Sequence, residues 1–268
     1  MKKLFLIILL IITGKISHAQ FYLQPRQTLN VAITSTEEPV VQTALQIFSR
    51  DYQAVFSGRV LTDSLKGNII VGTIGKSRLL ENILVDNATL YEKKQGFMLK
   101  VLKDGRLLVV GNDSHGTAYG LMELSRLIGV SPWEWWADAT PEKKTSFRLP
   151  TDYTDIQFPS VEYRGIFIND EDWGLMPWSS LTHEPWYKPG RIGPRTHERI
   201  FELLLRLRAN TYWPAMHECT EPFFMTQGNR EVARKYGIYI GSSHCEPMAC
   251  STPVEWNCLL YTSPSPRD

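Results

Sequence analysis

An alternation of strand and helix patterns between residues 163 and 241 constrains the fold of this chain most. Apolar runs predict strands over Tyr163–Ile168, Thr211–Met216 and Ile238–Gly241. Helical patterns separate them, one over Pro194–Arg208 with a proline in its first turn and one over Asn229–Tyr236. A strand, helix, strand series requires parallel strands joined by right-handed crossovers. The second half of the chain is therefore predicted to form an α/β sheet or barrel.

Polar residues are concentrated where each predicted strand ends. The first strand runs into Asn169–Trp173, the second into His217–Glu218 and the third into Ser242–Glu246. The carboxyl ends of parallel strands share one rim, and active sites lie at that rim. The pattern best fits the opening strands of a (β/α)₈ TIM barrel over residues 151–257. Three strands cannot close a barrel, so we expect it to be truncated.

Residues 20–150 mix helix and strand signals, which predicts a small N-terminal α+β domain. The predicted elements are a helix around Val40–Phe48, strands at Asn68–Gly72, Gly96–Leu102 and Arg106–Val110, and a helix over Thr117–Ile128. Asp104 and Gly105, between the last two strands, are typical of a hairpin turn. The stretch Gly72–Ser77 matches a phosphate-binding loop only in part, because Ile70 stands where that motif needs a glycine.

The first nineteen residues are typical of a secretory signal peptide. Two lysines precede an apolar run over Leu4–Ile12, and Ser17–Ala19 forms a small-x-small cleavage site ahead of Gln20. The apolar run is too short to span a bilayer, and no comparable run follows it. We expect an exported protein, periplasmic or secreted, with no membrane insertion.

Charge and cysteine content exclude several functional classes. The chain has 29 Lys and Arg against 28 Asp and Glu, and signal-peptide removal takes away lysines but no acid. This balance disfavours a nucleic-acid partner. The four cysteines, Cys219, Cys245, Cys250 and Cys258, lack the CxxC pairs of a zinc module and the even spread of a disulfide scaffold. They do not define the fold.

The last residues differ in character from the patterned region before them. Tyr261–Asp268 resembles translated adapter sequence. We therefore expect residues 258–268 to be a spurious tail; a genuine flexible tail is the alternative.

The residues at the predicted rim favour a carbohydrate ligand. Asp170 and Asp172 share one face if the first strand continues, and Trp173 and Trp178 follow them. Carboxylates bind sugar hydroxyls in pairs, and indole faces stack on pyranose rings. The tryptophan-rich segment Ser131–Trp136 has two interpretations, an interdomain packing contact or part of a sugar-facing wall.

His217 and His244 leave three roles open: metal ligands, general acid/base groups, or donors to an anionic group of a substrate. Together with Cys219 and Cys245 they would make a zinc site, although the spacings match no usual zinc signature. Histidines that are hydrogen-bonded at strand ends for structural reasons are the alternative.

Three long motifs in order, Tyr163–Gly174, Leu205–His217 and Gly241–Met248, resemble glycoside hydrolase family 115, the xylan α-1,2-glucuronidases. Gly116–Ser125 and Gly129–Ala137 are also similar to the family's first domain. The resemblance implies a small α/β domain ahead of a (β/α)₈ catalytic barrel. It further implies an enzyme that removes glucuronic or 4-O-methylglucuronic acid side chains from xylan with inversion, without a cofactor or a metal.

The resemblance also implies site residues. The family's Asn-Asp pair corresponds to Asn169 and Asp170, its third-strand histidine to His244, and its sugar-contacting tryptophan to Trp133. Asp170 is the predicted catalytic residue, while the main acid and base pair is expected on later barrel strands. The predicted substrate-binding set is Asn169, Asp170, His244, Trp133, Trp213, His217, Glu246 and Glu255. Here Glu255–Asn257 departs from the family's Glu-Trp-Asp segment.

The expected partner is glucuronoxylan or an oligosaccharide derived from it, and a homodimer of the complete protein is left open. Two other functions remain as alternatives. A non-catalytic carbohydrate-binding fragment would rely on Asp170, His244 and the tryptophans. A metal-dependent barrel hydrolase would be favoured by bound zinc or by sensitivity to chelators.

Overall fold

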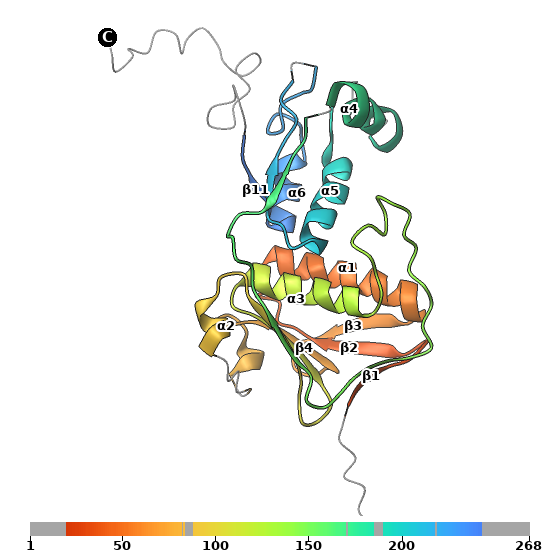
Figure 1. The fold of residues 1–268 in the computed structure, drawn as a ribbon, viewed down its shortest axis with the longest axis vertical. Coiled ribbons are helices and arrows are strands. Elements are labelled where there is room, and N and C mark those ends of the chain that lie inside the picture. Colours follow the sequence, from red (N-terminus) through yellow and green to blue (C-terminus); the bar gives the residue numbers. More distant parts are fainter. Residues whose placement is uncertain are drawn as a thin grey trace, which may run out of the picture.

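The computed structural model describes residues 20–81, 83, 88–169, 171–184, 190–217 and 219–242. The predicted signal peptide and the predicted tail lie outside these residues. The described chain forms an N-terminal unit, residues 20–157, and a C-terminal unit, residues 165–242, stacked along the long axis of the molecule (Figure 1). Within the described residues, no helix combines the length and apolar character that crossing a membrane requires.

A six-stranded mixed sheet is the centre of the N-terminal unit. In spatial order its strands are β3 (Arg59–Asp63), β2 (Thr28–Ala32), β4 (Ile69–Thr73), β6 (Leu107–Gly111), β5 (Phe97–Val101) and β8 (Thr154–Gln157). The first four are parallel, and β5 is antiparallel to both of its neighbours. The predicted hairpin between β5 and β6 is confirmed. The domain boundary at residue 150 stays a prediction, although β8, beyond it, pairs with this sheet.

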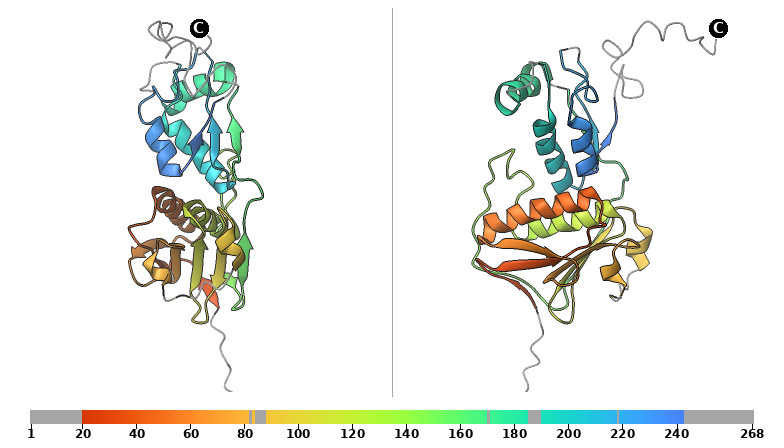
Figure 2. Two further views of the ribbon diagram at one scale, coloured as in Figure 1. Left: turned by 90° about the vertical axis from the view of Figure 1, so that its left-hand side faces the viewer. Right: turned by 180° about the vertical axis from the view of Figure 1, so that it is seen from behind.

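Two long helices, α1 (Pro39–Phe56) and α3 (Ser114–Leu127), lie side by side on one face of the sheet, between it and the C-terminal unit (Figures 1 and 2). A proline begins α1, where its missing N–H costs nothing. Asp113 caps α3 by accepting a hydrogen bond from the Gly116 amide. On the other face, the 3₁₀ turn η1 (Arg78–Leu80) and α2 (Ala88–Glu92) pack over a second, smaller apolar cluster. A short antiparallel pair, β1 (Phe21–Leu23) with β7 (Phe147–Leu149), completes the unit.

The C-terminal unit contains the predicted parallel strands and helices. The strands β9 (Gly165–Phe167), β10 (Thr211–Trp213) and β11 (Tyr239–Ile240) lie in the order β11-β10-β9 and are all parallel. The connecting helices α5 (Pro194–Arg206) and α6 (Asn229–Tyr236) confirm the helical predictions. Three short helical turns, η2 (Glu171–Leu175), α4 (Met176–Trp178) and η3 (Ser179–His183), follow β9. The α/β prediction is confirmed, and the assignment of these strands to the opening of a (β/α)₈ barrel stays a prediction.

The strand β10 is shorter than the sequence predicts. The prediction extended it to Met216, but it ends at Trp213. Pro214 follows and has no N–H to donate to a strand ladder, which explains the early end. The chain therefore turns away from the sheet before His217, and this turn brings the histidine into the loop at the rim.

A buried aromatic cluster holds α5 and α6 against the sheet. Tyr212 of β10 is fully buried and packs edge-on against Phe201 of α5 and against His197. His197 contacts Gly193 O and Asn229 Oδ1 through Nδ1, at 3.0 and 3.1 Å. Burial lowers the pKa of His197 to about 4, because removal from water penalises the charged imidazolium. The ring is thus a neutral structural element in this core.

A buried charge cluster joins the two units. Arg206 of α5 donates two hydrogen bonds to the Asp51 carboxylate of α1, at 2.7 and 2.8 Å, and also pairs with Glu202. Arg50 of α1 reaches Glu202 at 2.6 Å. Burial opposes the charge on Arg206, but hydrogen bonds from its guanidinium to Asp51 and Glu202 hold its pKa above the ordinary value. These contacts fix the orientation of the C-terminal unit on the N-terminal one.

Candidate functional site

A groove with a cavity volume of about 860 Å³ lies between the two units at the start of the predicted barrel. We call it the tryptophan groove. Its lining residues are Trp133, Trp136, Ile166, Phe167, Ile168, Asn169, Gly174, Leu175, Trp178, Ile200 and Leu203. Two of the predicted substrate-binding residues, Trp133 and Asn169, therefore share one cavity although they come from different units. The groove has the size and the aromatic lining of a site for a small organic ligand.

The segment Ser131–Trp136 contains both a packing contact and a residue exposed at the groove. Trp136 is half-buried and donates through Nε1 to the Arg199 carbonyl at 3.1 Å, and its ring packs edge-on against Trp135. The Arg199 guanidinium lies 4.9 Å from the Trp135 ring centroid, which adds a cation–π contact. Trp133, in contrast, is 48% exposed at the groove. Trp135 and Trp136 thus anchor the segment, and Trp133 is left accessible to a ligand.

Asn169 lies just beyond β9. The β9–β10 ladder continues to Ile168, whose amide donates to the Trp213 carbonyl at 3.0 Å. The exposed Asn169 follows at the carboxyl end of the strand, where the sequence predicts the rim. Its amide side chain is of a type that can donate to and accept from sugar hydroxyls.

Trp213 lies outside the tryptophan groove, and its predicted substrate-binding role stays a prediction. Its ring contacts Phe167 with a centroid separation of 6.3 Å and lines a smaller pocket of about 270 Å³ on β9 and β10. It is not among the residues that line the tryptophan groove. Tyr212, the preceding residue, is buried against the helices, so strand alternation directs Trp213 to the opposite face of the sheet.

His217 lies at the rim in contact with two other polar groups. Its Nδ1 is 2.9 Å from Asp172 Oδ2 and 3.8 Å from Cys219 Sγ. The Cys219 thiol donates to Asp172 Oδ1 at 2.6 Å. The sequence predicts His217 and Cys219 as candidate ligands but does not place Asp172 with them. That proximity depends on the loop conformations after β9 and β10, for which the sequence carries no local signal.

Four predicted site residues, Asp170, His244, Glu246 and Glu255, lie outside the described residues. Their predicted roles stay predictions. The sequence did not predict that Leu175, Ile200 and Leu203 form apolar walls of the groove. The helical pattern of α5 marks an apolar face but gives no sign that part of it lines a cavity rather than the core.

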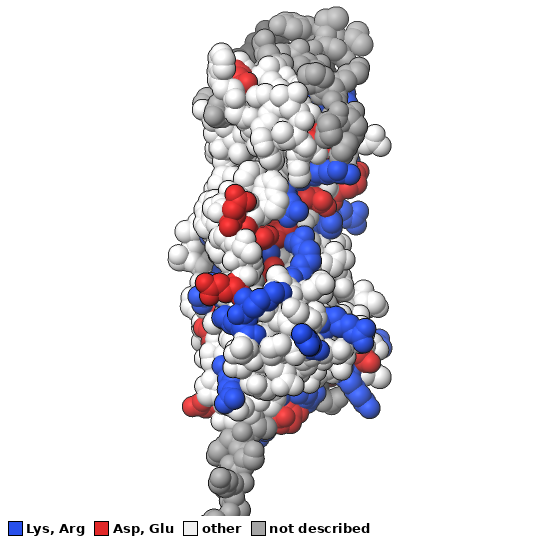
Figure 3. All heavy atoms as spheres, turned by 90° about the vertical axis from the view of Figure 1, so that its right-hand side faces the viewer, with Lys and Arg blue, Asp and Glu red and all other residues white. Residues whose placement is uncertain are grey.

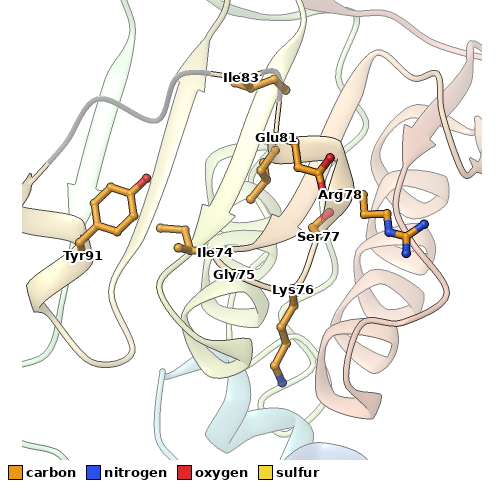
Figure 4. Close-up of a pocket in the computed structure, with 9 residues that line it drawn as sticks. Ile74, Gly75, Lys76, Ser77, Arg78, Glu81, Ile83 and Tyr91 are labelled. Atoms are coloured by element: carbon orange, nitrogen blue, oxygen red, sulfur yellow. The ribbon is translucent and has the colours of Figure 1, made fainter.

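A second pocket, of about 240 Å³, lies beyond the carboxyl end of β4 (Figure 4). It includes Gly75, Lys76 and Ser77 from the partial phosphate-loop motif. Lys76 Nζ pairs with Glu38 at 2.7 Å, and Figure 4 shows the Lys76 and Arg78 side chains pointing in different directions. The two cations therefore do not converge on one anion, and no long helix begins at this turn.

Positive and negative side chains are interspersed on the face of the molecule shown in Figure 3. Over the C-terminal unit, most of the surface that is not drawn in grey is white, which marks residues other than Lys, Arg, Asp and Glu. This face lacks the continuous basic surface that a polyanion-binding protein presents.

Comparison with known proteins identifies relatives of this chain. The model of glycosyl hydrolase family 115 matches residues 157–265. A solved family GH115 4-O-methyl-α-glucuronidase with specificity for decorated arabinogalactans is similar at 64% identity and a TM-score of 0.86, over 88% of this chain and 31% of that enzyme. The chain thus spans about a third of that enzyme's length. A search of curated proteins gives no match.

More distant structures share the fold alone. A chitobiase from Flavobacterium johnsoniae is 14% identical, with a TM-score of 0.51 over 87% of this chain and 34% of that protein. A GH20 exo-β-N-acetylglucosaminidase from Vibrio harveyi is 15% identical, with a TM-score of 0.50 over 93% of this chain and 37% of that protein.

Proposed function

The chain belongs to glycoside hydrolase family 115, and on this basis we propose that the whole protein is an α-glucuronidase that removes glucuronic or 4-O-methylglucuronic acid side chains from a plant polysaccharide. The observation that carries the proposal is the tryptophan groove, which Trp133 and Asn169 line from separate units in a chain 64% identical to such an enzyme. The catalytic domain is proposed to be a (β/α)₈ barrel of which β9, β10 and β11 are the first strands.

The groove suits a uronic acid ring for physical reasons. An exposed indole such as Trp133 offers an apolar face for the C–H surface of a pyranose. The Asn169 amide supplies both a hydrogen-bond donor and an acceptor in the same groove. A uronate carboxylate also requires a cationic or hydrogen-bonding partner, and His244 is proposed for that role. The tight packing of Trp135 and Trp136 keeps the Trp133 backbone in place, which lowers the entropy lost on binding.

Hydrolysis is proposed to proceed with inversion. An inverting glycosidase needs one carboxylic acid to protonate the leaving oxygen and one carboxylate to activate water, with the two groups roughly 6.5–9.5 Å apart. Asp170, which follows the groove-lining Asn169 in the sequence, is proposed as a catalytic residue. The other carboxylates of the reaction are proposed to lie on later strands of the complete protein.

Two polysaccharides are candidates for the substrate. The family resemblance of the sequence motifs implies xylan, whereas the 64%-identical enzyme has specificity for decorated arabinogalactans. The test is to incubate the complete protein with glucuronoxylan and with glucuronidated arabinogalactan, and to follow released acid and its first-formed anomer by NMR. Release from either supports α-glucuronidase activity, and initial appearance of the β anomer supports inversion. No release from both substrates, together with binding to them, would instead support a carbohydrate-binding role.

Export is proposed on the basis of the signal peptide. We expect cleavage after Ala19 and a periplasmic or secreted mature protein. N-terminal sequencing of protein recovered from the periplasm or medium should begin at Gln20. Protein that stays in the cytoplasm with an intact Met1 would contradict this.

A further inference from the structure

Three potential metal ligands of different chemistry lie together at the rim of the C-terminal unit. One ligand atom each from Asp172, His217 and Cys219 falls within 4.8 Å of the other two. Asp172 belongs to η2, which follows β9, while the other two belong to the loop after β10. The cluster therefore brings together two loops that are distant in sequence.

The spacing of the donor atoms suits a small cation with short bonds. The separations are 2.6 Å from Asp172 to Cys219, 2.9 Å from Asp172 to His217, and 3.8 Å from His217 to Cys219. Zinc bonds of about 2.0–2.3 Å place tetrahedral ligands roughly 3–4 Å apart. Sub-ångström side-chain movements would therefore bring the three donors to zinc distances. The Asp172 and His217 side chains are 35% and 65% exposed, so an ion can reach them from solvent.

The loop that carries two of the ligands is held in place by one hydrogen bond within it and by contacts with Gly190 and Arg191, which precede α5. The Thr220 amide donates to the His217 carbonyl at 2.9 Å and closes a turn around Cys219. The next residue, Glu221, donates its amide to Gly190 O at 2.8 Å and pairs through its carboxylate with Arg191. Ordering of this loop before the metal arrives lowers the entropic cost of binding.

The chemistry of the three donors selects the class of cation. A thiolate and an imidazole favour zinc and similar borderline metals over magnesium or calcium, which prefer oxygen ligands. Deprotonated Cys219 and Asp172 carry two negative charges, which a divalent cation balances, and a tetrahedral ion takes one ligand besides these three. Binding transfers the thiol proton of Cys219 to solvent.

We propose that Asp172, His217 and Cys219 bind a zinc-class divalent cation that ties the loops after β9 and β10 together. The site goes beyond the proposed glucuronidase activity, for which no metal is proposed. Gly174 and Leu175 of η2 line the tryptophan groove, and Asp172 belongs to the same turn. An ion at Asp172 therefore also holds one wall of the groove.

The test is a titration of the metal-free chain with Co²⁺ and Zn²⁺ in the presence of a non-thiol reductant. Co²⁺ should produce the near-ultraviolet charge-transfer band of a thiolate ligand, and Zn²⁺ should displace it. Cys219→Ser should abolish the band, while His217→Ala and Asp172→Asn should each weaken Zn²⁺ affinity at least about tenfold. Cys258→Ser and Asp152→Asn are the matched controls and should retain wild-type binding. A cobalt band that persists in Cys219→Ser would overturn the proposal.

A second measurement uses the unsubstituted chain, so its result does not depend on whether the variants fold. Zn²⁺ should slow alkylation of Cys219, mapped by mass spectrometry after tryptic digestion, because a metal-bound thiolate is a poorer nucleophile than the free one. An alkylation rate at Cys219 that is the same with and without Zn²⁺ would show that the thiol is not a ligand. Neither readout depends on sugar hydrolysis, so failure of the metal site is distinguishable from failure of the proposed function.

Discussion

Neighbouring tryptophans of the segment Ser131–Trp136 have different surroundings and should respond differently to truncation. Trp133→Ala removes an exposed ring from the groove and should lower kcat/KM of the complete enzyme about tenfold or more, with a stability change within about 0.5 kcal/mol. Trp136→Ala loses the bond to the Arg199 carbonyl and the contact with Trp135, and should destabilise the fold by about 2 kcal/mol. Kinetics and urea denaturation of the pair test this. Equal destabilisation by both changes would contradict a ligand-facing Trp133.

His197 should make stability depend on pH in a defined window. Its folded-state pKa is about 4, below the value of about 6.5 for an exposed histidine, so the unfolded chain binds the proton more readily. Stability from this residue is complete above about pH 6.5 and is lost as the pH falls toward 4. The loss amounts to about 3 kcal/mol.

Urea denaturation between pH 7.5 and 4.5 measures this dependence. The difference in unfolding free energy between the wild type and His197→Gln should shrink as the pH falls, because only the wild-type chain gains a proton at this position when it unfolds. A difference that stays constant across the window would show that His197 is not held neutral by burial.

The buried ion cluster between α1 and α5 should lose much of its stabilising effect when one partner is removed. Arg206→Met leaves the buried Asp51 carboxylate without its bidentate partner, which should cost about 3–5 kcal/mol. The half-exposed pair Lys235–Glu198 is a matched control, and Glu198→Gln should cost less than about 1 kcal/mol. Chemical denaturation compares the two. Similar small effects would mean that the buried cluster does not stabilise the contact between units.

Elements with strong local patterns could be predicted from the sequence. The helices α5 and α6, the hairpin of β5 and β6, and the parallel strands of the C-terminal unit follow from periodicity, proline and glycine signals. The pairing of β8 with β5 and of β1 with β7 could not, because long-range strand pairing leaves no local pattern. Likewise, the sequence indicates Trp133 and Asn169 as site residues, but no local pattern shows that these distant residues line one groove.

In the whole molecule, as far as the structure describes it, β9 lies at an edge of its sheet. Ile166 of this strand is 42% exposed. An exposed apolar edge favours association with other chains. We expect this chain to self-associate and to bind an apolar dye, and Ile166→Lys should reduce both without lowering thermal stability. Sedimentation velocity at several concentrations tests this. Unchanged association of the Ile166→Lys protein would place the contact elsewhere.

We propose that the rim after β9 belongs to an α-glucuronidase in which Asp170 takes part in catalysis. The most direct measurement is the rate of uronic acid release from decorated polysaccharide by the complete protein and by its Asp170→Ala variant, with circular dichroism as a check on folding. We predict release by the wild type and a loss of about 100-fold or more in the folded variant. Near-normal release by Asp170→Ala would contradict the catalytic role of Asp170, and no release by the wild type would contradict the α-glucuronidase activity.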